Sequence, residues 1–521
     1  MGELMKERVA KLREIREKAY LGGGPEKIEK QHQRGKLTAR ERVHRLLDPG
    51  SFVETGALTG HLEGAPGDGI VAGHGTIGGR VVCLYAQDAT VLGGSIGAQH
   101  GYKMYRTVER ALEMGVPLIG LCDSPGARAP RMGGGAADSV SVGEKSGTSV
   151  FYPNTQASGV VPQIAAIMGA CAGISVYSPA LMDFVFMVEG ISQMFITGPR
   201  VVKTTTGQDI TAEDLGGARV HAQVSGVCDL RTASEDECLE QIKRLVGFLP
   251  SNNTELPPVL DTGDSADRML DDLEDVVPDE PEKPYDIHEV IVRLVDNGDF
   301  FEIKPEFARE MVVGFARLAG QPIGIVANQP MVYGGALTVN SSDKQARFMR
   351  TCDAFNIPVI LLVDTAAYAP GSEQEHAGII RHGAKVLYAL SEAVVPRIGV
   401  LLRKAYGGGT LGMGTVPGLG TDVMFVWPAA EMGVLGARQS AMLFFGEEIM
   451  KAENPQQMLE EKVKEYRERF ANPAIMASAA PIFEDVIEPR ETRKRIIDTL
   501  RLLRGKRRDI RYIKRHGNIP L

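Results

Sequence analysis

The chain has 521 residues, of which 43% are hydrophobic and 24% charged, a globular balance that excludes a wholly disordered protein. Because this length exceeds the size at which a single hydrophobic core stops growing, it predicts two domains. The formal net charge of −8 argues against a general affinity for nucleic acid.

Several features bear on the compartment. No apolar run is long enough to cross a bilayer, and the first twenty residues are charged throughout, unlike a signal peptide. The six cysteines include no C-x-x-C pair, so we expect reduced, buried thiols, and the histidines show no metal-ligand spacing. The sequence predicts a cytoplasmic protein without a bound metal.

In chain order, short apolar strands are broken by glycine turns and followed by amphipathic helices, which is an α/β pattern. Residues 73–78 (GHGTIG) satisfy G-x-G-x-x-G, but a strand-like run at 81–85 follows where a dinucleotide site needs a helix. We therefore predict a β-turn there. Helices are predicted at 101–114 and 343–355.

The two halves of the chain share an internal repeat. Gly94 matches Gly335 and Asp123 matches Asp364, both at an offset of 241 residues (364 − 123). Between the halves, residues around 250–286 are rich in proline and acid, the composition of an exposed linker. The sequence thus predicts duplicated domains, residues 1–258 and residues 259–521.

The repeat weakens one catalytic alternative. Residues 93–97 (GGSIG) fit the G-x-S-x-G nucleophile elbow of a serine hydrolase. In the second half the glycines persist, but Ala336 stands where the first half has Ser95. The turn is kept and the hydroxyl is not, which disfavours a hydrolase.

Two glycine-rich turns stand at repeat-equivalent places: residues 171–174 (CAGI) and 405–409 (AYGGG). Each follows a buried strand and precedes helix-like sequence. Glycine lets a substrate approach the backbone, and a helix N-terminus favours negative charge, so N–H groups here are suited to an oxyanion hole. Two oxyanion holes would suit a reaction in which two anions develop. The alternative interpretation is that both segments are ordinary tight turns.

Further motifs extend over almost the whole chain: KLTARER at 36–42, LDPGSF at 47–52, TQASG at 155–159, MFITGP at 194–199, LGGAR at 215–219, VANQP at 326–330, GIIRHGA at 378–384, RKAYGG at 403–408 and HGNIPL at 516–521. In these the chain resembles the carboxyltransferase (β) subunits of biotin-dependent acyl-CoA carboxylases. That family includes propionyl-CoA carboxylase β, methylmalonyl-CoA decarboxylase α and the large transcarboxylase subunit.

The resemblance implies two tandem crotonase-like domains of ββα superhelical turns, the first on the acyl-CoA side and the second on the biotin side. It implies a homohexamer, a trimer of dimers, with active sites between the N-domain of one subunit and the C-domain of its dimer mate. The implied reaction moves a carboxyl group between N1-carboxybiotin and the α-carbon of an acyl-CoA. Because no segment resembles a biotinyl-lysine site or an ATP-binding module, we expect separate biotin carrier and biotin carboxylase partners, or membrane decarboxylase subunits.

The resemblance also assigns site residues. The Gly173 and Ile174 N–H groups would hold the thioester enolate, and those of Gly408 and Gly409 the ureido oxygen of biotin. Acyl-CoA contacts are expected at Gly126, Ala127, Arg128, Gly134, Ala172, Tyr177, Ala366, Tyr368, Thr410 and Leu411, and further biotin contacts at Tyr406 and Gly407.

The chain departs from the family at several of these positions. Leu411 replaces an acidic residue, Ile174 replaces the second glycine of the first hole, and residues 364–368 (DTAAY) replace DVPGF. With the 132–135 loop, these departures predict an altered acyl pocket. A decarboxylase or transcarboxylase subunit, a crotonase-type hydratase or thioester hydrolase, and a non-enzymatic scaffold for acyl-CoA or carrier remain alternatives.

Overall fold

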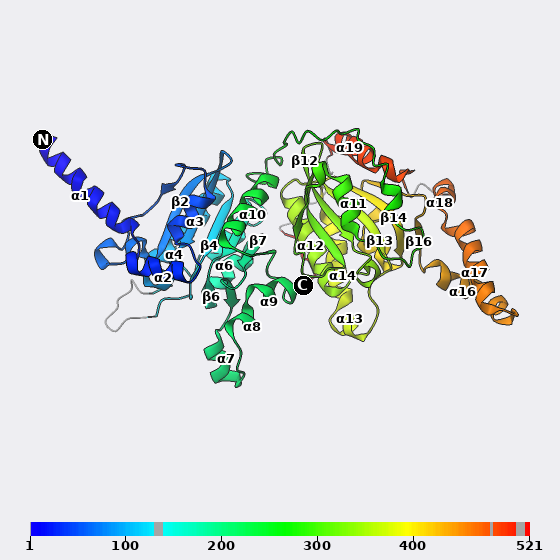
Figure 1. The fold of residues 1–521 in the computed structure, drawn as a ribbon, viewed down its shortest axis with the longest axis horizontal. Coiled ribbons are helices and arrows are strands. Elements are labelled where there is room, and N and C mark those ends of the chain that lie inside the picture. Colours follow the sequence, from blue (N-terminus) through cyan, green and yellow to red (C-terminus); the bar gives the residue numbers. More distant parts are fainter. Residues whose placement is uncertain (1, 130–138, 480–482, 507–515, 521) are drawn as a thin grey trace. The chain divides into compact units, whose positions relative to one another are not determined.

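The structure is a computed structural model that describes residues 2–129, 139–479, 483–506 and 516–520. The chain divides into two compact units, Met1–Leu256 (unit 1) and Pro257–Leu521 (unit 2) (Figure 1). Gly134 and the rest of the 132–135 loop lie outside the described residues. Each helix within the described ranges is too short or too polar to cross a membrane.

Unit 1 is built on a mixed sheet. Its strands are β1 Val53–Glu54, β2 Ile70–Ile77, β3 Arg80–Gln87, β4 Leu118–Cys122, β5 Gln163–Ile167, β6 Ala170–Ala172, β7 Phe184–Val188, β8 Gln193–Phe195 and β9 Leu230–Thr232. The main sheet has the order β1-β2-β3-β4-β5-β7-β9, antiparallel up to β3 and parallel from there on. Strands β6 and β8 form a separate parallel pair.

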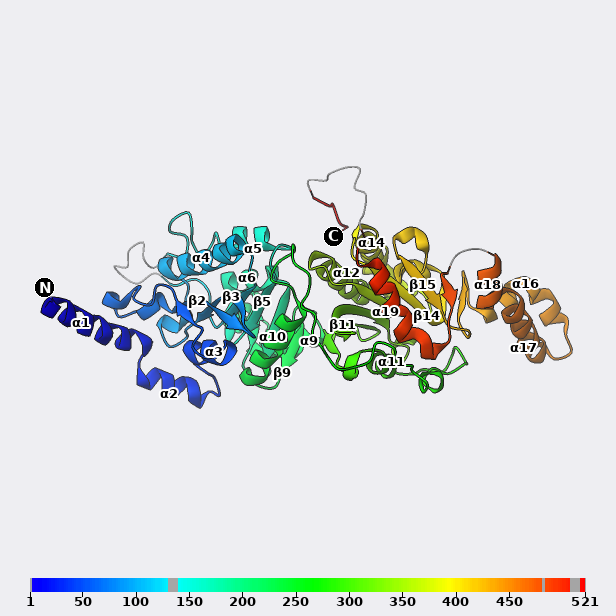
Figure 2. The ribbon, with the colours of Figure 1, turned by 90° about the horizontal axis from the view of Figure 1, so that it is seen from above.

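Helices cover both faces of this sheet. The helices of unit 1 are α1 Gly2–Tyr20, α2 Pro25–Gln33, α3 Ala39–Leu46, α4 Ala98–Met114, α5 Phe151–Ala157, α6 Tyr177–Leu181, α7 Pro199–Thr206, α8 Ala212–Gly216, α9 Ala218–Gln223 and α10 Glu235–Phe248. Figure 2 shows α4 and α5 on one face, with α3 and α10 on the other. Helix α4 buries Met104, Val108 and Ala111, spaced at three to four residues, in the core of the unit.

Unit 2 repeats this plan. Its strands are β10 Phe301–Ile303, β11 Met311–Leu318, β12 Gln321–Asn328, β13 Val359–Thr365, β14 Arg397–Tyr406, β15 Val423–Val426, β16 Glu431–Gly433 and β17 Asp485–Val486. The order is β10-β11-β12-β13-β14-β15-β17, again antiparallel first and then parallel, and β16 pairs with the far end of β14. The predicted α/β class with an internal duplication is confirmed.

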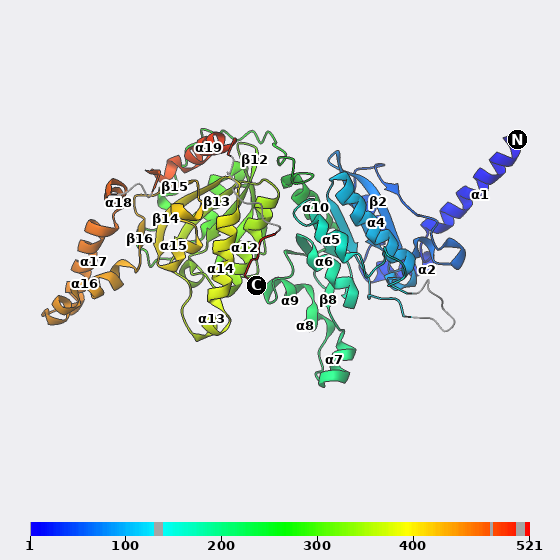
Figure 3. The ribbon, with the colours of Figure 1, turned by 180° about the vertical axis from the view of Figure 1, so that it is seen from behind.

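The helices of unit 2 are α11 Ile287–Leu294, α12 Val339–Ala354, α13 Ser372–His376, α14 Ile379–Glu392, α15 Gly408–Gly412, α16 Ala437–Lys451, α17 Pro455–Tyr466, α18 Pro473–Ala479 and α19 Thr492–Leu503. Helices α11 and α19 pack their apolar residues on the sheet within one core. Figure 3 shows α16 and α17 as an arm that extends from this sheet beyond β16.

The duplication extends to single contacts. Gly94 and Gly335 both have positive φ (70° and 73°), and a Cβ on either would lie 2.3 Å from the carbonyl oxygen of Asp123 or Asp364 respectively. Only glycine allows this approach between a turn and the end of the neighbouring strand. The glycines and aspartates that revealed the repeat therefore form the same contact in each unit.

A buried lysine also recurs at the 241-residue offset. The Lys103 ammonium donates to the carbonyls of Gly56, Gly67 and Ile70, and the Lys344 ammonium donates to those of Lys304, Phe307 and Ala308. Both side chains are almost wholly buried. Burial lowers the pKa of Lys103 to about 8 and that of Lys344 to about 7. Each lysine ties the connection between the first two strands of its unit to the helix that carries it.

The segment at 73–78 is mostly strand, which corrects the predicted β-turn. Residues up to Ile77 belong to β2, and the turn to β3 lies at Gly78 and Gly79, both with positive φ. A Cβ on Gly73 would lie 2.1 Å from the Val53 carbonyl oxygen of β1. This glycine therefore serves close strand packing rather than a turn.

The proline-rich and acidic stretch around 250–286 is only partly exposed. Leu270, Leu273 and Tyr285 are buried in the core of unit 2. The Arg403 guanidinium donates to the carbonyls of Glu280 and Lys283, so the last part of the stretch is fixed to β14. The proline-rich and acidic composition predicted an exposed linker and did not indicate that these few apolar residues would be buried.

Candidate functional site

The first glycine turn joins β6 to a short 3₁₀ segment, Gly173–Val176. Gly173 has a φ of 59°, and its N–H donates to the Ile196 carbonyl at 3.1 Å. That hydrogen bond occupies one of the two donors, Gly173 and Ile174, that the resemblance assigns to the enolate. No acceptor outside the turn is paired with the Ile174 N–H among the described residues.

The loop at 124–128 is locked against this turn. The Ser175 hydroxyl accepts from the Ala172 N–H (2.9 Å) and donates to the Ser124 carbonyl (2.8 Å). A Cβ on Gly126, which has a φ of 102°, would lie 2.5 Å from the Ala172 carbonyl oxygen. The structure therefore brings the predicted residues Gly126, Ala127 and Ala172 together at one edge of unit 1.

Arg128 has its charge satisfied within the protein. Its guanidinium pairs with Asp68 at 2.7 Å and donates to the Ser95 carbonyl at 2.9 Å, and its side chain is only 8% exposed. The geometry makes Arg128 a support of the 124–128 loop rather than a free cation. Tyr177, also predicted, is half-exposed at the start of α6 and makes an edge-on ring contact with Phe151.

The second glycine turn joins β14 to α15. Gly407 has a φ of 49°, its N–H donates to the Gly433 carbonyl (2.9 Å), and its own carbonyl accepts from the Thr410 hydroxyl (2.5 Å). Gly408 and Gly409 open the helix, where N–H groups lack an intrahelical acceptor. Over the described parts of the chain, neither N–H has an acceptor outside the turn.

The loop after β13 supports this turn. A Cβ on Gly409 would lie 2.8 Å from Thr365 Cγ2, and one on Gly408 would lie 3.0 Å from the Tyr368 ring. Of the predicted residues, Tyr368 thus contacts the second turn and Thr410 and Leu411 follow it, whereas Ala366 belongs to the supporting loop; Ala366 and Leu411 are exposed. Burial raises the pKa of the Tyr368 hydroxyl to about 12.

The two turns share one anchoring contact. In each, the first glycine of the turn, Gly173 or Gly407, donates its N–H to a carbonyl at the end of the neighbouring parallel strand, Ile196 or Gly433. This contact aligns Ile174 with Gly408. The free donors therefore begin at Ile174 in unit 1 and at Gly408 in unit 2.

A buried carboxylate precedes each supporting loop. Asp123 pairs with Lys36 (2.7 Å) and Arg42 (3.1 Å), whereas Asp364 pairs with Arg403 (3.0 Å) and lies 3.5 Å from Lys404. Burial raises the pKa of Asp364 and lowers the pKa of Lys404. The sequence repeat revealed both aspartates. Their cationic partners do not follow the repeat, so the sequence did not indicate which lysine or arginine pairs with each aspartate.

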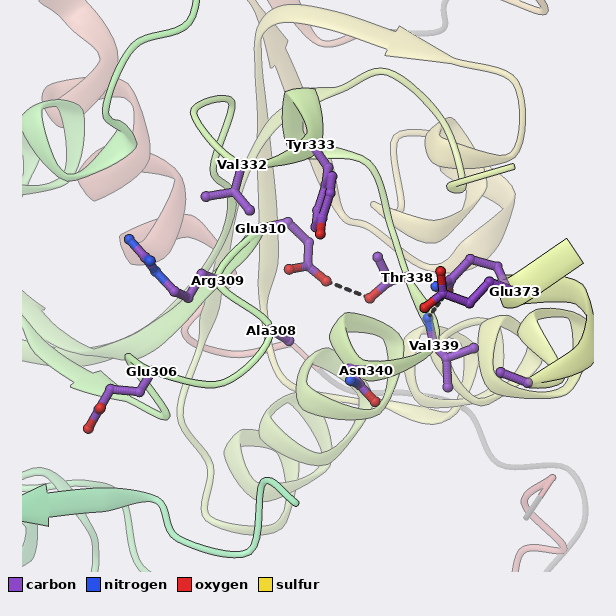
Figure 4. A pocket seen from close by; sticks show the side chains of 12 residues that line it. Glu306, Ala308, Arg309, Glu310, Val332, Tyr333, Thr338, Val339, Asn340 and Glu373 are labelled. Carbon is purple, nitrogen blue, oxygen red and sulfur yellow. Dashed lines mark hydrogen bonds between the residues drawn. The ribbon is translucent and has the colours of Figure 1, made fainter. Parts of the chain in front are cut away.

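A cavity of about 520 Å³ in unit 2 lies at the first turn of α12 (Figure 4). The nearly buried Glu310 carboxylate accepts from the Thr338 hydroxyl at 2.5 Å, and Arg309 and Tyr333 lie at the same cavity. At the repeat offset, its lining residues Val339 and Asn340 correspond to Ala98 and Gln99, which line a cavity of about 410 Å³ in unit 1. Of the predicted site residues that the structure describes, none lines either cavity.

Comparison with known proteins shows relatedness along nearly the whole chain. The model of a carboxyl transferase domain matches residues 30–519. The propionyl-CoA carboxylase carboxyltransferase subunit of Haloferax mediterranei is 47% identical over 99% of this chain and 100% of its own length. The α subunit of methylmalonyl-CoA decarboxylase of Veillonella parvula is 46% identical over 99% of each chain.

A solved structure agrees in fold. The transcarboxylase 12S crystal structure, described as a hexamer assembly with hydrolysed methylmalonyl-coenzyme A bound, has a TM-score of 0.92 and 44% identity over 99% of each chain. The similarity covers both units and the turns between their strands and helices.

Proposed function

The chain belongs to the carboxyl transferase family and is an enzyme of carboxyl transfer, and we propose that it is the carboxyltransferase component of a biotin-dependent system acting on an acyl-CoA. The observation that carries the proposal is the pair of equivalent turns: in each, the N–H of the first glycine is hydrogen-bonded to a neighbouring strand, and the N–H groups that follow have no acceptor outside the turn among the described residues. Unit 1 would serve the acyl-CoA and unit 2 the biotin.

The second turn fits biotin. A ureido oxygen is a neutral acceptor that gains negative charge when its ring nitrogen is deprotonated, and Gly408 and Gly409 offer adjacent donors at the start of a helix. Neither residue has a side chain to cover those donors. When bound on its separate carrier protein, biotin would supply the carboxyl group and take up the α-proton of the acyl-CoA; in the reverse direction it would accept the carboxyl group and return the proton.

The chain positions the two reactants and stabilises negative charge on their oxygen atoms through main-chain N–H groups. In unit 1, the Ile174 N–H stabilises the enolate oxygen of the thioester, with Gly173 fixing the turn through Ile196. In unit 2, the Gly408 and Gly409 N–H groups stabilise the ureido oxygen. Loss of one such donor costs on the order of 10²–10³ in turnover. No side-chain nucleophile is required by this mechanism.

The acyl pocket is proposed to differ from that of propionyl-CoA carboxylases because Leu411 replaces an acidic residue. Leu411 is 41% exposed and lies two residues beyond Gly409. We expect Leu411→Asp to change the ratio of kcat/KM values for acetyl-CoA and propionyl-CoA, measured over a substrate panel with a purified carrier. A wild-type enzyme with an ordinary propionyl-CoA preference would contradict this part.

The reaction can be tested with small molecules. Purified protein, free biotin and malonyl-CoA or methylmalonyl-CoA should give slow, biotin-dependent loss of the carboxyl group. Omission of biotin is the control, because a thioester hydrolase or hydratase would act without it. A protein that binds the acyl-CoA but shows no biotin-dependent turnover would instead be a scaffold.

The working assembly is proposed to be a cytoplasmic homohexamer, a trimer of dimers. It would act with a biotin carboxyl carrier and a biotin carboxylase, or with membrane decarboxylase subunits. Support comes from the hexameric transcarboxylase 12S relative. Light scattering of the purified chain gives the mass of the assembly, and a monomer at micromolar concentration would contradict the proposal.

A further inference from the structure

This inference rests on the proposed function and concerns what holds the second turn in place. Residues 407–409 are three consecutive glycines, and glycine loses more conformational freedom on ordering than any other residue. In unit 1 the corresponding turn contains a single glycine and is held by Ser175. The second turn therefore needs support from outside its own residues.

A chain of side chains provides such support. The Tyr406 hydroxyl donates to one Glu431 carboxylate oxygen at 2.7 Å, and Arg467 Nε lies 2.6 Å from the other. The Glu431 side chain is only 9% exposed, so its carboxylate is largely shielded from water, whereas the Arg467 side chain is 37% exposed. Burial raises the pKa of Tyr406, which keeps its hydroxyl protonated as a donor.

Tyr406 and Glu431 lie on two paired strands, and Tyr406 directly precedes the turn. Strands β14 and β16 pair in parallel, with Tyr406 opposite Gly433, and the next residue, Gly407, donates to the Gly433 carbonyl. Tyr406 is thus held by its side chain and Gly407 by its main chain. The position equivalent to Tyr406 in unit 1 is Ala172, which has no polar side chain.

Arg467 connects the helical arm, α16 and α17, to this series of side-chain contacts. It begins a π-helical segment, Arg467–Ala471, that follows α17, and π-helical segments are rare and frequently occur at functional sites. Its guanidinium also lies 3.9 Å from Glu282. Through Glu431, a residue of the arm thereby contacts the residue that precedes the three glycines.

We propose that Arg467 is a positioning residue for the second turn, acting through Glu431 and Tyr406 to hold the Gly408 and Gly409 N–H groups in place.

The test is Arg467→Gln, with Arg469→Gln as its matched control. Arg469 lies in the same π-helical segment but is exposed and pairs with Glu465 (2.8 Å) instead of Glu431. In the assay with free biotin and malonyl-CoA, we expect R467Q to lose roughly tenfold in kcat/KM for biotin, with the KM for malonyl-CoA unchanged. R469Q should match the wild type, and Arg467→Lys should recover part of the loss.

A double-mutant cycle tests the path through Tyr406. Tyr406→Phe removes only the hydroxyl. If both residues act through Glu431, the loss in R467Q/Y406F should be smaller than the product of the two single losses. Fully multiplicative losses would overturn the shared path.

Hydrogen exchange gives a readout that does not depend on activity. The peptide that covers residues 404–412 should exchange faster in R467Q than in R469Q or the wild type. An inactive wild type with this difference would refute the proposed function and leave the linkage intact. An active wild type with R467Q indistinguishable from R469Q in both kinetics and exchange would overturn the inference alone.

Discussion

Gly409→Ala is the sharpest perturbation of the proposed biotin hole. The new methyl group would lie 2.8 Å from Thr365 Cγ2 and 3.1 Å from Ala367 Cα, and the second contact is with backbone that cannot rotate away. The turn must therefore lift from the 365–368 loop and carry its N–H groups with it. Overpacking of this kind costs about 1–3 kcal/mol of stability, which a unit of this size survives.

The expected catalytic loss is much larger than the stability loss. A donor displaced from its acceptor costs on the order of 10²–10³ in kcat, roughly 3–4 kcal/mol in the transition state. The assay is biotin-dependent decarboxylation of malonyl-CoA, with thermal unfolding recorded in parallel. Gly418→Ala is the control, because no atom lies within 4 Å of its added Cβ. A G409A protein that unfolds at lower temperature but keeps wild-type kcat would refute the role of this turn.

Two further predictions concern stability in unit 2. Hydrogen bonding to Glu302, and secondarily to Asp286, raises the pKa of His288 to about 9, so its stabilising contribution is full below an unfolded pKa of about 6.5 and is lost as pH rises through 9. The thermal midpoint should fall over that window, less steeply in His288→Asn; parallel curves would contradict this. Arg403→Met leaves the Asp364 carboxylate buried without its closest cation and should cost about 3–5 kcal/mol in urea unfolding, partly recovered in R403M/D364N. A cost under about 1 kcal/mol would show that Lys404 alone suffices.

The duplication could be predicted because its signals are local and repeated. Gly94 and Gly335 are restricted to glycine by a strand end 2.3 Å from their missing side chains, and Asp123 and Asp364 end apolar runs. The strand-to-helix turns followed from the same local pattern. The glycines that mark these turns lie next to one another in the sequence, and one chain carries two copies for comparison.

The contacts of the turns could not be predicted in the same way. Gly173 donates to Ile196 across a pair of short strands, and Glu431 meets Arg467 from another helix, so neither contact leaves a periodic trace in the sequence. Arg128 was predicted as an acyl-CoA contact, and its ion pair with Asp68, sixty residues earlier in the chain, left no sign in the sequence. Long-range pairing decides which donors and charges remain available, and one sequence does not record it.

The paired lysines offer a practical consequence. An amine-reactive reagent attacks the neutral amine and needs access to it, and neither Lys103 nor Lys344 has access while its three carbonyl contacts hold. Their labelling rates therefore report how often each unit opens locally. Mass spectrometry of the reagent-labelled protein would thus report local opening separately for each half of the molecule, without an engineered label.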